Sequence, residues 1–598
     1  MTGNSMDCIK ENFNYPDRYL LGILCVSFLL RIWGISYGMP YAFILDETYL
    51  VNRSLAFGTG DFNPHLFEWP GHLLMYALFA IYGVYFVVGY VVGIFSSAED
   101  FALSFMSDPS YFYIIGRVFI VLLSTTTVYV TYLVGTWAYD RKTGLIAAIF
   151  LAVSPLVSGV AHFILTDNLV LLASIGLFIP ALRIISTGLA KDYFWGGLII
   201  GLGMAIKYNA GALIIPLGVA HMLHIVQNRK PILSIYVHKR FFIAGLSLLS
   251  GFLMGCPYCL LDYPSFIRDL VFQFSRVSEV GMINAEYASP FLYYLQEALA
   301  GGIGLGITIV CLFGIAHSLY QRRSVDILFL IYIAIYFLYV SSWKVAIDKY
   351  LLPIIPSIII IGASMISRIS DKLPVHQKIN SYIMISAIFI LGAEPLVKSL
   401  QVDYTLTQKD TRSIAKEWIE ATISEGTKIA IDSGRLNIAK LSPPLNDTPN
   451  NLYKIFVERG MISDNKYLKS VGNISNKYYD LLTRSNSGKK YPLTRIVLSS
   501  DGRVDRSLSV EELIKNNVEY VVVSSFAYEG YVSPSYRQNH PEAADYYTRF
   551  YRELDETYNL IKEFRSDPNR RQGPTIKIYR IPASESGKAM ISEVYNEK

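Results

Sequence analysis

Long apolar runs separated by short polar stretches make up the first two thirds of the chain. Each run is about as long as a helix that crosses a bilayer, so the pattern predicts a polytopic α-helical membrane region. The polar start, residues 1–18, has no small-residue cleavage site before the first run, and we interpret that run as a retained anchor. The runs fall near 20–37, 71–95, 114–137, 144–161, 168–187, 195–206, 209–226, 241–260, 299–319, 326–342, 350–367 and 382–400.

The basic connections between the runs predict the topology. They lie around Arg141, in 229–240, at Arg322 and in 368–378, and the positive-inside tendency assigns all of them to the cytoplasmic side. All these connections can lie on the cytoplasmic side only if the run 71–95 lies on the outer face instead of crossing the membrane. This run is interrupted by glycines and rich in tyrosine. We therefore expect about eleven spans plus external interfacial helices, with the N-terminus inside.

With this parity, several polar segments share the outer side of the membrane. Lys207 lies between two short runs, which is typical of a broken helix that lines a cavity. Lys344 and Lys349 emerge at the same face. We expect the long outer loop 261–298 to cover a site there and to act as a gate. Its tyrosines include Tyr287, Tyr293 and Tyr294. The remaining outer segments are the loop 38–70 and the junction 161–168.

The character of the chain changes after about residue 400. Helix-like and strand-like segments alternate, which is typical of a soluble α/β domain. We expect a membrane domain over residues 1–400 and an extracytoplasmic α/β domain over residues 401–598. The predicted elements are an amphipathic helix opening at 410–412 and running through 417–419, and strands at 428–432, 520–525 and 575–581, with polar loops at 441–451 and 483–490.

Composition narrows the function classes. The chain is 52% hydrophobic and 14% aromatic, which is too apolar for a soluble protein of 598 residues. The net charge of +5 is spread over many loops, so no nucleic-acid partner is expected. All five cysteines lie in or near predicted spans, so no disulfide framework holds the C-terminal third together. They are Cys8, Cys25, Cys256, Cys259 and Cys311.

Acidic residues in the first outer loop carry the candidate chemistry, because carboxylates at a membrane face are costly unless they are used. Glycosyl transfer onto a hydroxyl needs a base, positive charge for a phosphate leaving group, and a pocket for a lipid carrier. Asp46 follows the apolar stretch 42–45, and burial there would make it a better base. The supporting candidates are Glu47, Glu68 and Asp167 for the sugar or a divalent cation, and Lys207, Lys344 and Lys349 for the carrier phosphate.

Each of these residues also has a structural interpretation. The acidic pair at 46–47 is often an ordinary surface pair, and Asp167 fits a helix N-cap as well as a ligand. Lysines at span ends snorkel to the interface. His65 and His72 lie near carboxylates, but their spacing matches no tight metal-ligand pattern. The agreement of the candidates on one face of the membrane, and not any single residue, favours a site.

Several stretches together carry a family resemblance. They are Asp46-Glu47-Thr48-Tyr49, Gly60-Asp61-Phe62-Asn63-Pro64-His65, Phe67-Glu68-Trp69-Pro70, Thr166-Asp167, Ile206-Lys207-Tyr208 and Lys349-Tyr350-Leu351-Leu352-Pro353. Their order resembles the GT-C glycosyltransferases, in the branch of the protein O-mannosyltransferases and the lipid A aminoarabinose transferase. Trp69 stands where that branch often has Lys, and Lys349 where it often has Arg.

The resemblance implies a monosaccharide donor linked to polyprenyl or dolichyl phosphate, a hydroxyl acceptor outside the cytosol, and inversion at the anomeric carbon. The acceptor class stays open among protein, glycolipid and polysaccharide. By motif match, Asp46 is the catalytic carboxylate with Glu47 beside it. The substrate-binding residues would be Glu68, His65, Asp167, Lys207, Lys344, Lys349 and Tyr350. A divalent metal cation is an open cofactor, with Asp46, Glu68 and Asp167 as candidate ligands.

Other classes remain to be weighed. A multi-span transporter or lipid-linked sugar flippase would also have many spans and intramembrane charge. It would not need a large external domain or an acidic loop ahead of an interfacial helix. An N-linked oligosaccharyltransferase would show a Trp-Trp-Asp motif, which does not occur in the sequence. We therefore expect a glycosyltransferase of a prokaryotic plasma membrane, surrounded by membrane lipids.

Overall fold

The chain divides into two compact units in a computed structural model. The helical unit consists of Met1–Ile35, Tyr49–Tyr82 and Ile115–Tyr404. The sheet unit consists of Ser36–Thr48, Gly83–Ile114 and Thr405–Lys598. The structure describes residues 18–229, 239–276, 289–432, 441–458, 479–485, 488–497, 504, 508–567 and 569–582.

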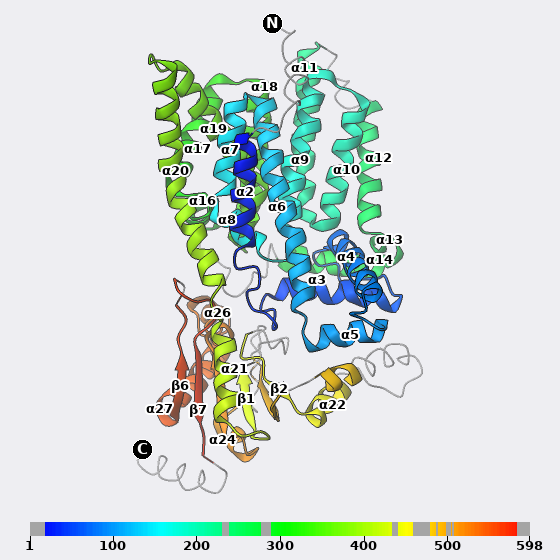
Figure 1. Ribbon diagram of the computed structural model, residues 1–598, viewed down its shortest axis with the longest axis vertical. Helices are drawn as coiled ribbons and strands as arrows, with labels where there is room; N and C mark the ends of the chain where they lie inside the picture. Colours follow the sequence, from blue (N-terminus) through cyan, green and yellow to red (C-terminus); the bar gives the residue numbers. More distant parts are fainter. Residues whose placement is uncertain are drawn as a thin grey trace. The chain divides into compact units, whose positions relative to one another are not determined.

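The helical unit is a bundle of long apolar helices that run roughly parallel in Figure 1. The bundle helices are α2 (Arg18–Ile32), α6 (Ser110–Ala138), α7 (Arg141–Ala152), α8 (Pro155–Ala161), α9 (Thr166–Thr187), α10 (Ala190–Ile206), α11 (Ile214–Gln227), α12 (Lys239–Gly255), α16 (Leu299–Ile303), α17 (Leu305–Gln321), α18 (Ser324–Ser341), α19 (Ile355–Lys372) and α20 (Gln377–Leu406).

The span count agrees with a polytopic membrane protein. Among the described residues, seven helices are long and apolar enough to cross a membrane, and nine candidates result if each bent helix pair is one span. The bent pairs are α7 with α8, at 59°, and Pro290–Ile303 with α17, at 119°. The apolar helices α2, α10 and α12 are slightly shorter, with 15, 17 and 17 residues. The seven candidates include α4 (His72–Val91), and the eleven spans expected from the sequence stay a prediction.

Small residues bring α10 and α12 unusually close together. A Cβ added at Gly197 would lie 2.1 Å from the carbonyl oxygen of Ala244, and one added at Gly201 would lie 2.0 Å from that of Leu248. Glycines on facing helices permit this backbone approach in membrane bundles. The contact fixes the end of α10, where Lys207 follows, against the end of α12.

Several elements gather where α10 and α12 end. Gly71 N donates to the carbonyl oxygen of Ile206 (2.9 Å), so α4 begins at that end of the bundle. The other elements are α3 (Leu45–Ala56), η1 (Phe57–Thr59), α13 (Tyr258–Leu261), α14 (Tyr263–Ser275), α15 (Pro290–Tyr293), η2 (Tyr208–Leu213), η5 (Tyr294–Ala298) and η6 (Asp348–Ile354).

The sheet unit has the α/β character that the sequence predicts. Its five-stranded sheet has the order β4-β1-β5-β7-β6, with β1 parallel to β4 and β5, and β7 antiparallel to β5 and β6. Ile419, Ile429, Val522 and Ile578 are buried in its core. The strands are β1 (Ile429–Asp432), β4 (Leu493–Ile496), β5 (Tyr520–Ser524), β6 (Asn559–Phe564) and β7 (Ile576–Arg580). The remaining elements are β2 (Asn446–Asp447), β3 (Lys490–Tyr491), α5 (Ala98–Ser107), α21 (Thr411–Thr422), α22 (Pro449–Glu458), α24 (Val510–Lys515), α25 (Ser525–Tyr528), α26 (Pro534–Asn539) and α27 (Pro541–Thr557).

The structure corrects three local expectations. The predicted loop 38–70 contains the twelve-residue helix α3, which no glycine or proline interrupts and which buries Leu50 and Val51. The predicted polar loop 441–451 contains β2 and the start of α22. Strand β6 was missed because its residues are mostly exposed and do not alternate between polar and apolar.

Candidate active site

The backbone breaks at Lys207, as the two short apolar runs predicted. Helix α10 ends at Ile206, Lys207 is extended with a φ of −158°, and a 3₁₀ turn (η2) precedes α11. Helix α10 begins at Ala190, about five residues earlier than the sequence run suggested. The extended residue turns its side chain away from both helix axes, toward α9.

Asp167, in the first turn of α9, holds two lysines. Its Oδ1 lies 2.8 Å from Nζ of Lys207, and its Oδ2 lies 3.8 Å from Nζ of Lys349. The Asp167 side chain is 6% exposed, while those of Lys207 and Lys349 are 16% and 24% exposed. Two lysine side chains therefore lie on one mostly buried carboxylate. Cations held in such a place can stabilise an anion.

An aromatic ring, part of a hydrogen-bonded group of residues, lies next to the Lys207 ammonium. Its Nζ lies 5.0 Å from the ring centroid of Tyr350, which in turn meets the ring of Trp343 at 5.2 Å. The hydroxyl of Tyr336 donates to the carbonyl oxygen of Tyr350 (3.1 Å) and accepts from Nδ2 of Asn209 (3.0 Å). Oδ1 of Asn209 is buried and has no hydrogen-bond partner among the described residues. Sequence reasoning singled out neither Trp343 nor Tyr336.

The start of η6, which carries Lys349, and the residue before it meet the end of the long outer loop. The hydroxyl of Tyr293 donates to Asp348, and that of Tyr294 accepts from the amide of Ile347 (3.3 Å). Tyr287 lies outside the described residues, and the gating role of this loop stays a prediction. Lys344 is exposed, and the structure brings Lys349 to Asp167.

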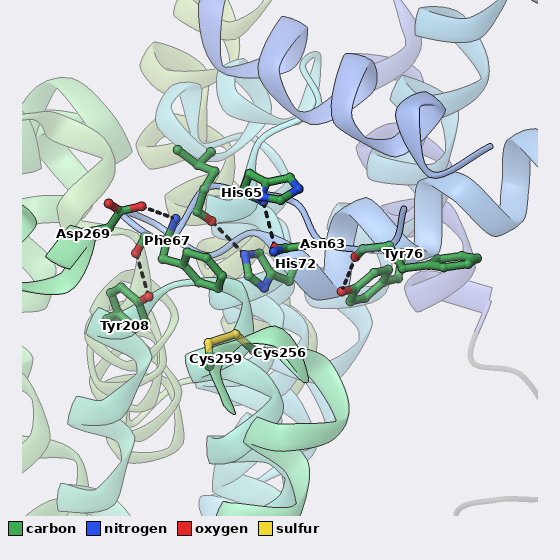
Figure 2. Close-up of a disulfide and its surroundings, with 11 residues drawn as sticks. Asn63, His65, Phe67, His72, Tyr76, Tyr208, Cys256, Cys259 and Asp269 are labelled. Atoms are coloured by element: carbon green, nitrogen blue, oxygen red, sulfur yellow. Dashed lines mark hydrogen bonds between the residues drawn. A yellow bond between two sulfur atoms is a disulfide. The ribbon is translucent and has the colours of Figure 1, made fainter. Parts of the chain in front are cut away.

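The segment around Glu68 is held by neighbours that sequence reasoning missed. The amide of Phe67 donates to Asp269 (3.1 Å), and the hydroxyl of Tyr208 donates to the Phe67 carbonyl (2.7 Å), as Figure 2 shows. Glu68 pairs with Arg276 at 3.4 Å. Tyr208 directly follows Lys207, so the acidic segment is tied to the helix break.

His65 lies apart from the lysine cluster. Its side chain is 59% exposed and its Nε2 lies 2.8 Å from Oδ2 of Asp61. The hydrogen bond from His65 lowers the pKa of Asp61 below its ordinary value. The structure therefore places His65 in an exposed local pair, and its role in substrate binding stays a prediction.

Asp46 and Glu47 form the first turn of α3. Glu47 is fully buried, whereas Asp46 is half-buried, so burial of Asp46 is less complete than expected. One turn later, Leu50 belongs to the helical unit, where a Cβ added at Gly71 would lie 3.1 Å from Leu50 Cδ2 and 3.4 Å from Thr166 Cγ2. Helix α3 thus approaches the residue that precedes Asp167.

The segment ahead of Asp46 is fixed within the sheet unit by the start of α21. Arg412 donates from Nε and Nη2 to the two oxygens of Asp410, at 2.7 Å each. The Arg412 guanidinium also lies 3.9 Å from the ring centroid of Phe43, and Tyr37 donates its hydroxyl to Asp410. Asp410, the N-cap of α21, is therefore a common partner for both segments. We call Tyr37, Phe43, Asp410 and Arg412 the arginine clamp.

Comparison with known proteins finds one sequence family and several solved structures similar to this chain. Residues 114–254 match the family described as dolichyl-phosphate-mannose-protein mannosyltransferase. The fold is similar to that of ArnT from Cupriavidus metallidurans bound to undecaprenyl phosphate, with a TM-score of 0.50 and 11% identity over 94% of this chain and 97% of that one. The apo structure of the same protein gives a TM-score of 0.50 and 12% identity over the same shares. No curated protein sequence matches the chain.

A weaker likeness extends to a solved structure of a second protein. The Archaeoglobus fulgidus oligosaccharyltransferase, tethered with an acceptor peptide, has a TM-score of 0.46 and 12% identity over 88% of this chain and 72% of that one. The chain therefore has a fold like that of ArnT, and residues 114–254 match the mannosyltransferase family. Neither finding supports the transporter or flippase alternative.

Proposed function

We propose that this protein is an integral-membrane glycosyltransferase that moves a monosaccharide from a polyprenyl- or dolichyl-phosphate donor to an acceptor hydroxyl. Transfer takes place on the extracytoplasmic side of a prokaryotic plasma membrane and inverts the anomeric carbon. The acceptor is a protein, a glycolipid or a polysaccharide. The observation that carries the proposal is the placement of Lys207 and Lys349 on the single buried carboxylate of Asp167.

The lysine pair suits a departing lipid phosphate. The donor phosphodiester carries one negative charge. When the bond between the anomeric carbon and the phosphate oxygen breaks, the lipid phosphate keeps the electron pair and carries two. Two ammonium groups therefore stabilise the departing phosphate more than the donor, which is the condition for catalysis. Asp167 holds Lys207 and Lys349 in position before the donor binds, so little reorganisation is needed.

Asp46 is the proposed base. As the acceptor oxygen bonds to the anomeric carbon, its proton passes to the Asp46 carboxylate. Attack on the face opposite the phosphate gives inversion. Asp46 is half-buried in the first turn of α3, and the fully buried Glu47 fixes that turn. The helix N-terminus also favours a carboxylate there.

The remaining predicted residues bind the substrates in this proposal. Glu68, held by Arg276, and the buried Oδ1 of Asn209 accept hydrogen bonds from sugar hydroxyls. The ring of Tyr350 supports the Lys207 ammonium. The exposed residues His65 and Lys344 have secondary roles toward the acceptor and the carrier headgroup.

A metal requirement is a separate question, with Asp46, Glu68 and Asp167 as candidate ligands. Both oxygens of Asp167 face ammonium groups. Neither Glu68 nor Asp167 belongs to a group of three candidate ligands within the part of the chain that the structure describes. We therefore expect turnover to survive EDTA. If EDTA abolished turnover and Mg²⁺ or Mn²⁺ restored it, these carboxylates would be assigned to metal binding.

The test is donor turnover by the full chain in lipid nanodiscs. A panel of polyprenyl-phosphate and dolichyl-phosphate sugars is offered, and the released lipid phosphate is measured. Wild type is compared with Asp46→Asn, which keeps the size of the side chain and removes its basicity. The control is Asp371→Asn, an exposed aspartate paired with Lys142.

We expect turnover by wild type and by Asp371→Asn, and a loss of about 100-fold or more in Asp46→Asn, the scale of a missing general base. Full turnover by Asp46→Asn would contradict the assignment of Asp46 as the base, but not the assignment to the glycosyltransferases. Failure of every lipid-phosphate sugar to turn over or bind would overturn the proposed function itself.

A further inference from the structure

A cysteine pair lies outside the chemistry assigned above, directly beneath the acidic segment. Cys256 and Cys259 follow the end of α12 in the order Cys-Pro-Tyr-Cys and form a disulfide, with their Cα atoms 5.6 Å apart. Both are buried with Phe67 and Ala205 in one apolar cluster. Figure 2 shows the pair next to His72.

His72 presents an unused nitrogen to the two sulfur atoms. Its side chain is fully buried, and its Nε2 lies 2.8 Å from the carbonyl oxygen of Leu66. Because a carbonyl can only accept, Nε2 carries the proton and Nδ1 keeps a free lone pair. Nδ1 is buried and has no hydrogen-bond partner in the described parts of the chain. A buried nitrogen without a partner is costly, so it calls for a ligand.

Three candidate donor atoms therefore converge from segments far apart in the sequence. One donor atom of His72 and the Sγ atoms of Cys256 and Cys259 lie within 4.8 Å of one another. No other group of three His, Cys, Asp or Glu donors is formed by the described residues. Two thiolates and one imidazole form a donor set that binds zinc in proteins.

We propose that His72, Cys256 and Cys259 bind a zinc ion when the two cysteines are in their thiol form. The chain is synthesised with thiols, so this form needs no reductant. Binding releases the two thiol protons and forms two zinc–sulfur bonds and one zinc–nitrogen bond, to Nδ1 of His72. The disulfide in the structure uses the same sulfur atoms, so the zinc site and the disulfide exclude each other.

Charge balance selects zinc over a monovalent soft ion. Two thiolates neutralise Zn²⁺, and a neutral centre suits the surrounding apolar side chains, whereas Cu⁺ would leave a buried negative charge. The Leu66 carbonyl on Nε2 of His72 is the outer hydrogen bond that orients a metal-bound imidazole. In either state, the two cysteines support the segment that carries Glu68. The zinc proposal does not depend on the proposed transferase activity.

The test uses Co²⁺ as a spectroscopic probe for zinc on the full chain in nanodiscs. Metal-free protein reduced with a phosphine should bind about one equivalent of Co²⁺, with a thiolate-to-cobalt charge-transfer band in the near ultraviolet that Zn²⁺ removes. Cys256→Ser combined with Cys259→Ser should lack the band. His72→Ala should keep it but bind roughly tenfold or more weakly.

Two controls separate this site from other thiols and from misfolding. Cys25→Ser combined with Cys311→Ser removes the two other described cysteines, which are free, and should leave the band unchanged. Oxidised wild type, with the disulfide intact, needs no substitution and should show no band. Absence of the band in reduced wild type, or its persistence in Cys256→Ser/Cys259→Ser, would overturn the proposal.

Discussion

Two buried aspartates, one in each unit, show how the partners of a carboxylate decide its use. Asp167 in the helical unit has two lysines as partners. Among the described residues, Asp432, the last residue of β1 in the sheet unit, has neutral partners: its oxygens accept from the Tyr551 hydroxyl (3.0 Å) and the Ser524 amide (2.9 Å). Both side chains are nearly inaccessible.

The difference is one of charge compensation. Asp167 has two lysine partners, which suits an anionic ligand in the function proposed above. Around Asp432 no cation among the described residues offsets the cost of burial, and burial raises the pKa of Asp432 to about 7. In the proposed function Asp167 positions the two lysines, whereas Asp432 makes the fold sensitive to pH. Substitutions at each aspartate or its partners test this difference.

The largest effect is expected for Lys207→Ala, which removes one of the two cations at Asp167. Turnover should fall by about 100- to 1000-fold, as for the loss of one group that stabilises a developing oxyanion. The affinity for free polyprenyl phosphate should fall as well, because that product carries the charge. Released lipid phosphate and product inhibition measure both quantities.

Lys142→Ala is the matched control for the lysine. Lys142 also pairs with an aspartate, Asp371 at 2.6 Å, but both side chains are about half exposed, and such pairs contribute about 1 kcal/mol or less. Lys207→Arg should retain a part of the activity. Equal turnover by Lys207→Ala and Lys142→Ala would mean that the cluster is only structural.

Asp432→Asn tests the buried aspartate of the sheet unit. In the unfolded chain Asp432 ionises near its ordinary pKa of 3.8, whereas in the folded chain it ionises at about 7. The folded state therefore holds an extra proton between these pH values, and stability falls as pH rises through this window. The loss, complete above pH 7, is up to about 4 kcal/mol. The substituted amide is never charged, so the variant should lack this loss.

Hydrogen exchange of β1 and β5 in the full chain, at pH 5 and pH 8, measures this effect. In wild type the strands should exchange faster at pH 8 than the intrinsic rate change explains, and Asp432→Asn should remove the excess. Asp545→Asn, an exposed aspartate paired with Arg537, should behave like wild type. If wild type showed no excess exchange at pH 8, ionisation of Asp432 would cost little folding free energy.

The arginine clamp provides a third case, a buried aspartate with a single cation. Arg412→Lys keeps the charge but loses the two-point bond to Asp410 and the stacking on Phe43. We expect local destabilisation of about 2 kcal/mol and a turnover number about tenfold lower, with the donor KM unchanged, because the segment leading to Asp46 is held less firmly. Lys409→Gln, in the exposed pair with Glu417, is the control. A raised KM at unchanged turnover number would contradict a positioning role.

Much of the helical unit follows from the sequence, because span length, basic connections and the break at Lys207 each have a direct physical cause. The parity of the spans predicted that Asp167, Lys207 and Lys349 share one face, but not that both lysines contact Asp167. The three central strands were confirmed since their residues are apolar and β-branched. Strand β6, which is mostly exposed, gave no such signal.

What the sequence did not predict depends on contacts between distant segments. Asp269 and Arg276 reach the acidic segment from α14, about 200 residues later in the chain. The Cys-x-x-Cys spacing at 256–259 was a local signal for a metal or redox site. Its partner His72 lies far from it in the sequence, where the neighbouring candidate ligands are carboxylates. The burial of Glu47 instead of Asp46 follows from the rotation of α3, which a segment expected to be a loop could not reveal.

The smallest effect is expected for substitutions of Tyr350, whose ring lies next to the Lys207 ammonium. They test whether groups around the two lysines contribute to donor binding in addition to the lysine charges. Tyr350→Leu removes the aromatic face that lies 5.0 Å from the ammonium, whereas Tyr350→Phe keeps it. A cation–π contact at a partly exposed site contributes about 0.5–1 kcal/mol, so Tyr350→Leu should raise the donor KM about two- to fivefold. Tyr350→Phe should match wild type, because the backbone carbonyl of Tyr350, not its side chain, accepts from Tyr336. If Phe and Leu raised KM equally, the Tyr350 hydroxyl would be the group that contacts the donor, and the preference of this site for an anion would rest on the two lysines alone.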